Sequence, residues 1–368
     1  MTSRHPELAH FDASLPIERA ATPPSSWYTS PGIESLEQRT VFARNWLAVA
    51  RRDQLGQPSA YVAEDIAGEP FVVTRDPQDR LRAFYNVCRH HAATLVDGTG
   101  CADSLVCPYH GWTYGLDGRL LKAPGLGAIE NFEPAENGLV EVAAAGWSPL
   151  VFICAGERPR DLPADLEPLG RQLDSTGWQQ LRFVESRRYE LACNWKVYVD
   201  NYLDGGYHVP HLHGGLAGQL DLDSYTTELG GRFSIQRATA GGSADSARDP
   251  VEFRDRIGDG AVYAWVYPNL MINRYGPVLD TNRVLPLGVD RCEVVFDWYF
   301  DTPVDEAFIE RSLAASEQVQ REDTLICESV QRGLNSRAYD RGRYSALKEQ
   351  PMYHFHQLLA ADLAESPG

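Results

Sequence analysis

The segment CNWKVYVDNYLDGGYHVPHLH, residues 193–213, is the part of the chain that points most clearly to a chemical task. It places Asp204 four residues before His208, a spacing that puts both side chains on one face of a helix. His213 follows five residues later, where an uninterrupted helix would splay the two imidazoles apart. Pro210 disfavours helical geometry in the residue before it, and so predicts a turn that returns His213 toward His208. Two converging imidazoles near carboxylates are the beginning of an iron or zinc site, and packed or surface histidines are the alternative.

A third ligand for such a site lies on a second predicted helix, residues 305–335. Its apolar members recur on one stripe, which consists of Val319, Ile326, Cys327 and Val330. Asp323 falls in the same stripe, and a carboxylate on a buried face must be paired, neutralised or bound to a cation. Two histidines and one carboxylate form the facial triad of oxygen-activating iron(II). An ion pair of Asp323 with an arginine is the alternative. Glu322 competes as the ligand, but its polar helical neighbours favour exposure to solvent.

A second motif combines cysteines and histidines in two short loops: Cys88 and His90, then Cys107 and His110. Each pair follows a predicted strand, so two loops of a β scaffold could present four ligands to one point. A zinc ion would take all four in a tetrahedron. A Rieske [2Fe-2S] cluster would take the cysteines on one iron and the histidines on the other. The C-x-H spacing favours the cluster, because structural zinc sites generally space paired ligands by two to four residues.

Together these motifs resemble the α subunit of the Rieske non-heme iron oxygenases, the ring-hydroxylating oxygenase superfamily. The resemblance extends from about Ile33 to Leu359. Its choline monooxygenase and betaine demethylase branch is the most similar, in NWKVYVDNYLDGGYHVP, AWVYPNLMINRYGP and REDTLICESVQRGL. The resemblance implies that a Rieske cluster delivers electrons to a mononuclear iron(II), which activates O2. It also implies that His208 and His213 are the iron histidines, and it agrees with Asp323 as the third ligand.

The family pattern further implies a homotrimer in which one subunit's cluster lies next to the neighbouring subunit's iron. A carboxylate joins a cluster histidine to an iron histidine in that arrangement. Here Gly205 occupies the position three before His208, where many relatives carry an acid. Asp204 is therefore the expected bridging residue, with Asp200 as the alternative. Asn201 is expected to form hydrogen bonds near the iron.

The pattern of short strands and helices predicts an α+β protein in three parts. Residues 1–46 form an N-terminal segment packed on the catalytic domain, and residues 47–154 form an all-β Rieske domain of short alternating strands. Residues 155–368 form the catalytic domain, where antiparallel strands followed by helices predict a sheet covered by helices, of the helix-grip type. A helix is expected over residues 191–207, a hairpin turn over residues 288–290, and a loop over residues 241–249.

Composition narrows the class of protein. The 368 residues are 43% hydrophobic and 23% charged, as in a folded globular protein, and the net charge of −17 opposes binding to nucleic acid or an anionic membrane. The sequence has neither a membrane-spanning run nor the apolar core of a signal peptide, so we expect a cytoplasmic protein. It lacks a dinucleotide-binding G-x-G-x-x-G motif. Electrons from NADH or NADPH should therefore arrive through a separate flavin or iron–sulfur reductase or a ferredoxin.

The substrate is the least determined feature. Aromatic residues alternate along two predicted strands: Tyr263, Trp265 and Tyr267 on one, and Phe296, Trp298 and Phe300 on the other. They could form an aromatic cage for a quaternary ammonium, although ordinary packing of the sheet explains most of them. A small quaternary amine resembling choline, betaine or carnitine is implied mainly by the resemblance. Aromatic-ring hydroxylation is the alternative, followed by an electron-transferring Rieske ferredoxin without oxygenase activity.

Overall fold

The structure is a computed structural model that describes residues 6–127, 129–213, 220–241 and 256–365. Two compact units are present: Phe42–Pro163, and Met1–Val41 together with Ala164–Gly368. The boundaries that we predicted lie at 46/47 and 154/155. Arg160 lies past the predicted boundary at 154/155, but its carbonyl accepts a hydrogen bond from the Trp46 indole at 2.7 Å. This bond holds the start of the connector to the unit Phe42–Pro163. Residues 242–249 of the expected loop lie outside the described residues.

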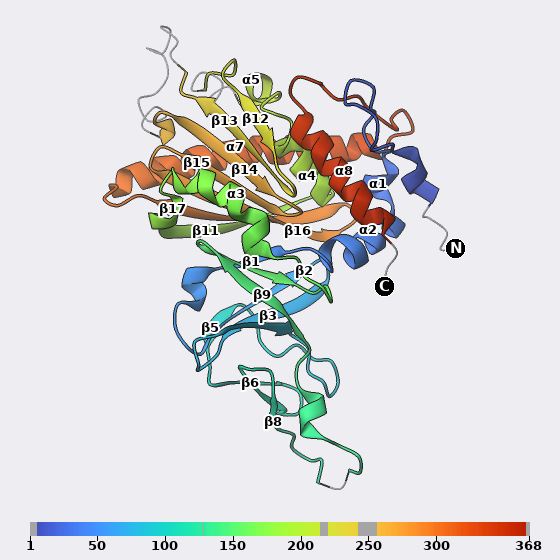
Figure 1. Cartoon of the computed structure of the whole chain (residues 1–368), viewed down its shortest axis with the longest axis vertical. Coiled ribbons are helices and arrows are strands. Elements are labelled where there is room, and N and C mark those ends of the chain that lie inside the picture. Colours follow the sequence, from blue (N-terminus) through green and yellow to red (C-terminus); the bar gives the residue numbers. More distant parts are fainter. Residues whose placement is uncertain (1–5, 128, 214–219, 242–255, 366–368) are drawn as a thin grey trace. The chain divides into compact units, whose positions relative to one another are not determined.

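The unit Phe42–Pro163 is built from β-strands, as predicted for a Rieske domain (Figure 1). One seven-stranded sheet has the order β1-β10-β9-β4-β3-β2-β5, and a three-stranded sheet has the order β6-β7-β8. The strands are β1 Leu47–Arg51, β2 Ala60–Ile66, β3 Glu69–Arg75, β4 Leu81–Tyr85, β5 Thr99–Cys101, β6 Ser104–Val106, β7 Thr113–Gly115, β8 Leu120–Lys122, β9 Glu141–Trp147 and β10 Leu150–Cys154. Strands β4 and β6 end just before the two Cys-His pairs, so the scaffold fixes where each pair begins.

The second unit contains a seven-stranded antiparallel sheet of order β11-β17-β16-β15-β14-β13-β12. Its strands are β11 Arg182–Leu191, β12 Thr226–Leu229, β13 Phe233–Thr239, β14 Gly260–Val266, β15 Leu270–Tyr275, β16 Val278–Gly288 and β17 Arg291–Phe300. The predicted hairpin is confirmed, because Gly288 pairs with Arg291 across the turn between β16 and β17. The α+β class with an antiparallel sheet covered by helices is confirmed as well.

The helices are α1 Ser26–Thr29, α2 Pro31–Glu37, α3 Leu162–Asp174, α4 Trp195–Tyr202, α5 Val209–Leu212, α7 Glu306–Leu334 and α8 Gln350–Ala364. Of these, α4, α7 and α8 contact strands of this sheet (Figure 1). Helix α4 contacts both α7 and β16, and α7 contacts β11. Asp305 caps α7 by accepting a hydrogen bond from the Phe308 amide at 2.8 Å, which confirms the predicted start of this long helix.

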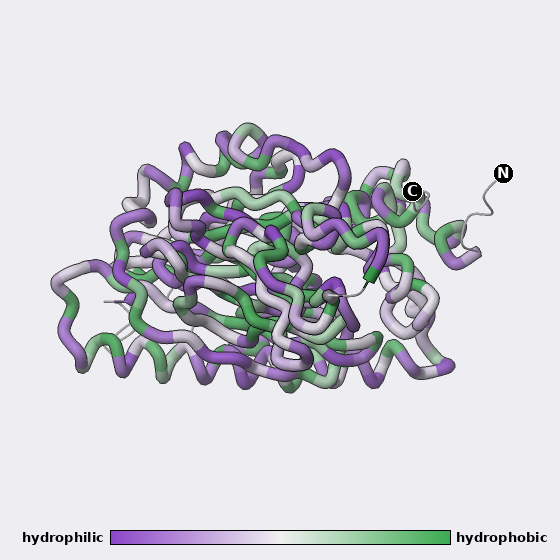
Figure 2. Tube along the Cα trace, turned by 90° about the horizontal axis from the view of Figure 1, so that it is seen from below, coloured by the Kyte–Doolittle hydropathy of each residue, from purple (hydrophilic) through white to green (hydrophobic). Residues whose placement is uncertain are grey.

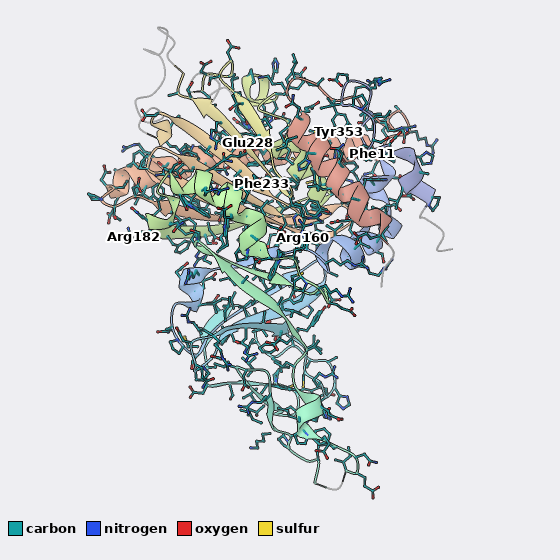
Figure 3. The ribbon with its side chains drawn as sticks, in the orientation of Figure 1. Phe11, Arg160, Arg182, Glu228, Phe233 and Tyr353 are labelled. Carbon is teal, nitrogen blue, oxygen red and sulfur yellow. The ribbon has the colours of Figure 1, made fainter. Side chains whose placement is uncertain are left out.

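The N-terminal segment packs on the same unit as α4 and α8. Phe11 and Tyr353, labelled in Figure 3, have ring centroids 6.3 Å apart. Glu37, at the end of α2, forms a buried ion pair with Lys196 of α4 at 2.6 Å. This pair links the segment before the Rieske unit to the helix that leads into the 193–213 motif.

In the part of the chain that the structure describes, no helix has both the length and the apolar character needed to cross a membrane. Figure 2 shows hydrophobic and hydrophilic residues interspersed along the trace.

Candidate metal centres

The break after α4 is made by two glycines. Helix α4 ends at Tyr202, five residues before the predicted end at 207, and Gly205 and Gly206 follow with φ of +69° and +72°. A side chain at Gly205 would clash with the Lys348 carbonyl, so only glycine fits this close approach. The turn that we predicted at Pro210 is therefore misplaced. Pro210 lies in the first turn of α5, where its missing N–H costs nothing.

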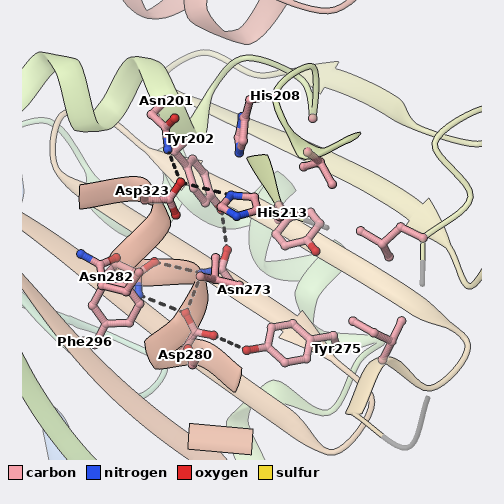
Figure 4. Close-up of a pocket in the computed structure, with 18 of the residues that line it drawn as sticks. Asn201, Tyr202, His208, His213, Asn273, Tyr275, Asp280, Asn282, Phe296 and Asp323 are labelled. Atoms are coloured by element: carbon pink, nitrogen blue, oxygen red, sulfur yellow. Dashed lines mark hydrogen bonds and ion pairs between the residues drawn. The ribbon is translucent and has the colours of Figure 1, made fainter. Parts of the chain in front are cut away.

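The short helix α5 sets the distance between the two histidines, because His208 precedes its first residue and His213 follows its last. Asp323 reaches the same point from α7, with its Oδ1 3.2 Å from His213 Nε2. One ligand atom from each of the three residues lies within 4.8 Å of the others. Figure 4 shows the three side chains converging at one end of a pocket. This donor set and spacing fit a facial triad for iron(II).

Each histidine is held by a carboxylate at its Nδ1 atom. Asp204 Oδ2 lies 2.6 Å from His208 Nδ1, and Glu322 Oε2 lies 2.7 Å from His213 Nδ1. Such contacts fix the tautomer of a ligand histidine and leave Nε2 for the metal. Burial acts to lower the pKa of His213, but Asp323 and Glu322 outweigh it and raise that pKa. The concentrated negative charge favours a bound cation.

The prediction that Glu322 is exposed to solvent is wrong. Its side chain is only 27% exposed and contacts His213. The helical neighbours of Glu322 are polar, as the sequence indicated, but its partner comes from a distant segment that helical spacing does not reveal. The apolar stripe was also only partly correct, because Ile326 and Val330 are 38% and 45% exposed.

The two remaining candidates near His208 have different surroundings. Asn201 donates a hydrogen bond from Nδ2 to Asp323 Oδ1 at 2.8 Å, so it lies beside the triad as expected. Asp200 instead accepts a hydrogen bond from the Tyr28 hydroxyl at 2.7 Å and lies 2.9 Å from His356 Nε2. The structure therefore brings Asn201, but not Asp200, to the triad.

In the Rieske unit the four predicted ligands lie on two loops. Cys88 and His90 follow β4, and Cys107 and His110 follow β6. The rings of the two histidines have centroids 4.7 Å apart. The second loop is closed tightly by the Cys107 amide, which donates to the Trp112 carbonyl at 2.7 Å.

These loops fit an iron–sulfur cluster. The thiols of Cys88 and Cys107 are buried, and His90 Nδ1 is buried without a hydrogen-bond partner among the described residues. Burial acts to raise the pKa of Cys107, but the backbone N–H groups of the next loop residues outweigh it and lower that pKa. Two buried thiols and two neighbouring imidazoles on paired loops are the donor set of a Rieske cluster.

A cavity of about 150 Å³ opens from the triad toward the sheet. Of the six aromatic residues considered for a cage, Tyr263 and Phe296 line this cavity. Trp265 and Tyr267 instead lie against Phe355 of α8, at centroid distances of 5.4 and 6.3 Å. Ordinary packing therefore explains these two.

The cavity also contains residues that sequence reasoning missed, above all Asn273 and Asp280. The signal was present in β16, where Asp280 and Asn282 alternate and therefore share a face.

Family models match both units. The model of the Rieske [2Fe-2S] domain matches residues 45–133, and the model of the ring hydroxylating alpha subunit, catalytic domain, matches residues 178–365. The second match alone spans more than half of the chain. The chain belongs to the ring-hydroxylating oxygenase α subunits. This Rieske oxygenase is an enzyme whose cofactors are a Rieske cluster and a mononuclear iron.

Relatives of this Rieske oxygenase include the choline monooxygenase of Arabidopsis thaliana, 46% identical over 97% of this chain and 86% of the relative. The carnitine monooxygenase oxygenase subunit of Escherichia coli is 31% identical over 95% of this chain and 97% of the relative. A solved quaternary ammonium Rieske monooxygenase in complex with L-carnitine has a TM-score of 0.83 and 28% identity, with 98% of this chain and 99% of that chain covered. The resemblance inferred from the motifs is confirmed.

Proposed function

We propose that this Rieske oxygenase oxidises a small quaternary amine, resembling choline, betaine or carnitine, by hydroxylation or oxidative N-demethylation. The observation that carries the proposal is the cavity at the triad, which is lined by aromatic rings of Tyr198, Tyr202, Tyr225, Tyr263, Tyr275 and Phe296. Aromatic faces attract a quaternary ammonium by cation–π interactions. A cavity of about 150 Å³ suits a compact ligand. The names of the relatives support the same substrate class.

In this proposal His208, His213 and Asp323 bind the mononuclear iron. Asp204 and Glu322 hold the two imidazoles in the orientation that binding requires, and Asn201 positions Asp323 through its hydrogen bond of 2.8 Å. The iron, when bound, supplies the activation of O2. The protein contributes a fixed ligand geometry and a largely apolar cavity that excludes water from the reacting carbon.

We assign the Rieske cluster to Cys88 and Cys107 on one iron and to His90 and His110 on the other. His110 is exposed, and the neighbouring Tyr109 is 65% exposed. An exposed histidine edge suits electron transfer to a partner site outside the unit. The electrons come from NADH or NADPH through a separate reductase or ferredoxin.

We further propose a homotrimer, in which the face around Asp204 receives the cluster edge of a neighbouring subunit. A second cavity beside α7 is lined by both Asp200 and Asp204, together with the part-exposed Ile326 and Val330. Apolar side chains exposed beside acidic groups are typical of a surface that another chain covers. Asp204 is the bridging residue, because its hydrogen bond to His208 leads directly to the iron site.

The test is turnover of the reconstituted enzyme. Purified protein, a reductase, NADH and ¹⁸O2 are incubated with choline, glycine betaine and carnitine, and products are identified by mass spectrometry. We expect consumption of at least one amine with uptake of labelled oxygen. No oxidised or demethylated product across the panel, together with hydroxylation of an aromatic compound, would establish the alternative function. We propose the cytoplasm as the site of action, although the plant relatives are named chloroplastic.

A further inference from the structure

Asp280 is a buried acid in the wall of the proposed substrate cavity. It lies on β16, is 3% exposed, and lines the same cavity as the iron triad. Across the sheet it pairs directly with Asn273 of β15, which pairs in turn with Tyr263 of β14. Directly opposed residues of neighbouring strands project from the same face. One face of the sheet therefore presents a carboxylate, an amide and an aromatic ring in a row to the cavity.

Three donors hold this carboxylate. Asn273 Nδ2 donates to Asp280 Oδ1 at 2.6 Å, Asn282 Nδ2 donates to the same oxygen at 3.0 Å, and the Tyr275 hydroxyl donates to Oδ2 at 2.6 Å. Burial raises the pKa of Asp280, and the hydrogen bonds to its carboxylate offset that effect only in part. Figure 4 shows these donors gathered around Asp280. The network therefore fixes the position of the carboxylate, and a cation bound beside it would favour its charged form.

The carboxylate forms no direct ion pair within the described part of the chain. Arg256 also lines the cavity, but its Nη2 donates to the Tyr275 hydroxyl at 2.7 Å and its guanidinium lies 4.7 Å from the Tyr275 ring centroid. The Tyr275 hydroxyl thus stands between the guanidinium and Asp280. A buried carboxylate without a contacting cation is costly, and a cationic ligand in the cavity would remove part of that cost.

The kind of cation follows from the hydrogen bonds. An ionised carboxylate offers about four acceptor positions, and three donors already occupy Asp280. A primary ammonium would need further acceptors for its N–H groups. A quaternary ammonium has no N–H group and so needs no hydrogen-bond acceptor. Its positive charge can interact with the Asp280 carboxylate and with the face of a neighbouring aromatic ring.

The position of Asp280 also orients the ligand. Asn273 lies between the triad and Asp280 in Figure 4, and its Oδ1 accepts a hydrogen bond from the Tyr202 hydroxyl at 2.8 Å. A ligand whose ammonium contacts Asp280 therefore presents its opposite end to the iron. We propose that Asp280 binds the ammonium of a quaternary amino alcohol such as choline, so that the alcohol carbon is oxidised and the N-methyl groups are not. This inference rests on the proposed function and specifies its substrate and product.

The reaction balances as a monooxygenation. A C–H bond of the CH2OH carbon is replaced by C–OH, which gives the aldehyde hydrate. One atom of O2 enters the product and the other leaves as water. The two electrons come from NADH through the reductase, with one proton from solvent. N-demethylation would instead hydroxylate a methyl carbon and release formaldehyde.

The experiment compares two probes of the same shape, choline and the neutral 3,3-dimethyl-1-butanol, with the holoenzyme. Binding of both is measured for wild type, Asp280→Asn, Asp280→Glu, and Asp301→Asn as a control acid that follows β17 outside the cavity lining. We expect wild type to prefer choline. Asp280→Asn should weaken choline binding by about 30-fold or more, because one member of a buried charge pair is lost, with little change for the neutral probe. Asp280→Glu and Asp301→Asn should keep the preference for the cation.

Equal weakening of both probes in Asp280→Asn, or no change in either, would show that Asp280 only supports the fold and would overturn the inference. Iron content and cluster absorbance of each variant establish that it is folded. The product supplies the second criterion: an aldehyde hydrate from choline supports the orientation, and formaldehyde as the main product contradicts it. If wild type binds choline but Asp280→Asn does so equally well, only this inference fails. If wild type neither binds nor oxidises any quaternary amine, the proposed function fails with it.

Discussion

Asp204 Oδ2 lies 2.6 Å from His208 Nδ1, and the same carboxylate accepts the backbone N–H groups of Tyr207 and His208 at 3.1 and 2.9 Å. This one side chain therefore shapes the turn after α4 and holds the first iron histidine. Gly205 cannot take over the second task, since its positive φ and the nearby Lys348 carbonyl leave no room for a side chain. The carboxylate that contacts His208 therefore comes from Asp204, the residue before Gly205.

Asp204→Asn tests the bridging role of this carboxylate. The amide keeps the size and one acceptor oxygen, so both metal centres should remain occupied when iron(II) is supplied in excess. Substrate-coupled O2 consumption should fall by up to about 100-fold, because carboxylates that contact a metal-binding histidine are typically worth 10- to 100-fold in activity. Turnover is measured alongside iron content and the visible spectrum of the cluster. Asp200→Asn is the matched control, since Asp200 contacts Tyr28 and His356, and normal turnover of the Asp204 variant would exclude the bridge.

The role of Glu322 at the second iron histidine, His213, can be tested separately. Glu322→Gln removes the negative charge at His213 Nδ1 and should weaken iron(II) binding by about 10- to 100-fold. Iron affinity is measured by titration of the iron-depleted protein. Gln318→Ala serves as the control, because Gln318 donates to the outer oxygen of Glu322 at 2.8 Å and does not touch the histidine. Unchanged affinity in the Glu322 variant would mean that its contact with His213 is incidental.

Residues close together in the sequence could be predicted as site residues, whereas contacts between distant segments could not. Cys88, His90, Cys107 and His110 could be predicted because their spacing is local, and the same holds for His208 and His213. Asp323 was found through a stripe that is only partly buried, so its identification rested as much on resemblance as on periodicity. The contact of Glu322 with His213 was missed because the two residues lie 109 positions apart along the chain. Asp280 was missed although it alternates with Asn282 along β16, because the sequence does not show that both faces of this strand are buried.

Removal of the mononuclear iron should separate the two centres. The intact enzyme should contain about three irons per chain, two in the cluster and one at the triad. Dialysis against a mild chelator should leave about two irons and the red-brown absorbance, because buried thiolates hold the cluster more firmly than one carboxylate and two imidazoles hold a single ion. Oxygenation should then be lost and should return with added iron(II). Zinc in place of iron, with a colourless protein, would contradict the assignment of Cys88, His90, Cys107 and His110.

A buried ion pair joins the N-terminal segment to α4. Lys196 Nζ and Glu37 Oε1 are 2.6 Å apart, both side chains are almost fully buried, and Glu37 also accepts a hydrogen bond from the Trp195 indole at 2.9 Å. Lys196→Met leaves the Glu37 charge buried without its cation. The free energy of unfolding should therefore fall by about 3–5 kcal/mol.

The double variant Glu37→Gln/Lys196→Met should recover part of that loss, since it removes the unpaired charge and keeps an acceptor for Trp195. Urea unfolding followed by tryptophan fluorescence measures the change, and Lys122→Met, at an exposed lysine of β8, is the control. Lys196 Nζ also lies 5.5 and 5.3 Å from the ring centroids of Tyr28 and Trp195. If the double variant is as unstable as Lys196→Met, the loss comes from these packing contacts and not from the unpaired charge. Because α4 leads directly to Asn201 and Asp204, the variant with the larger loss of stability should also bind iron(II) less tightly.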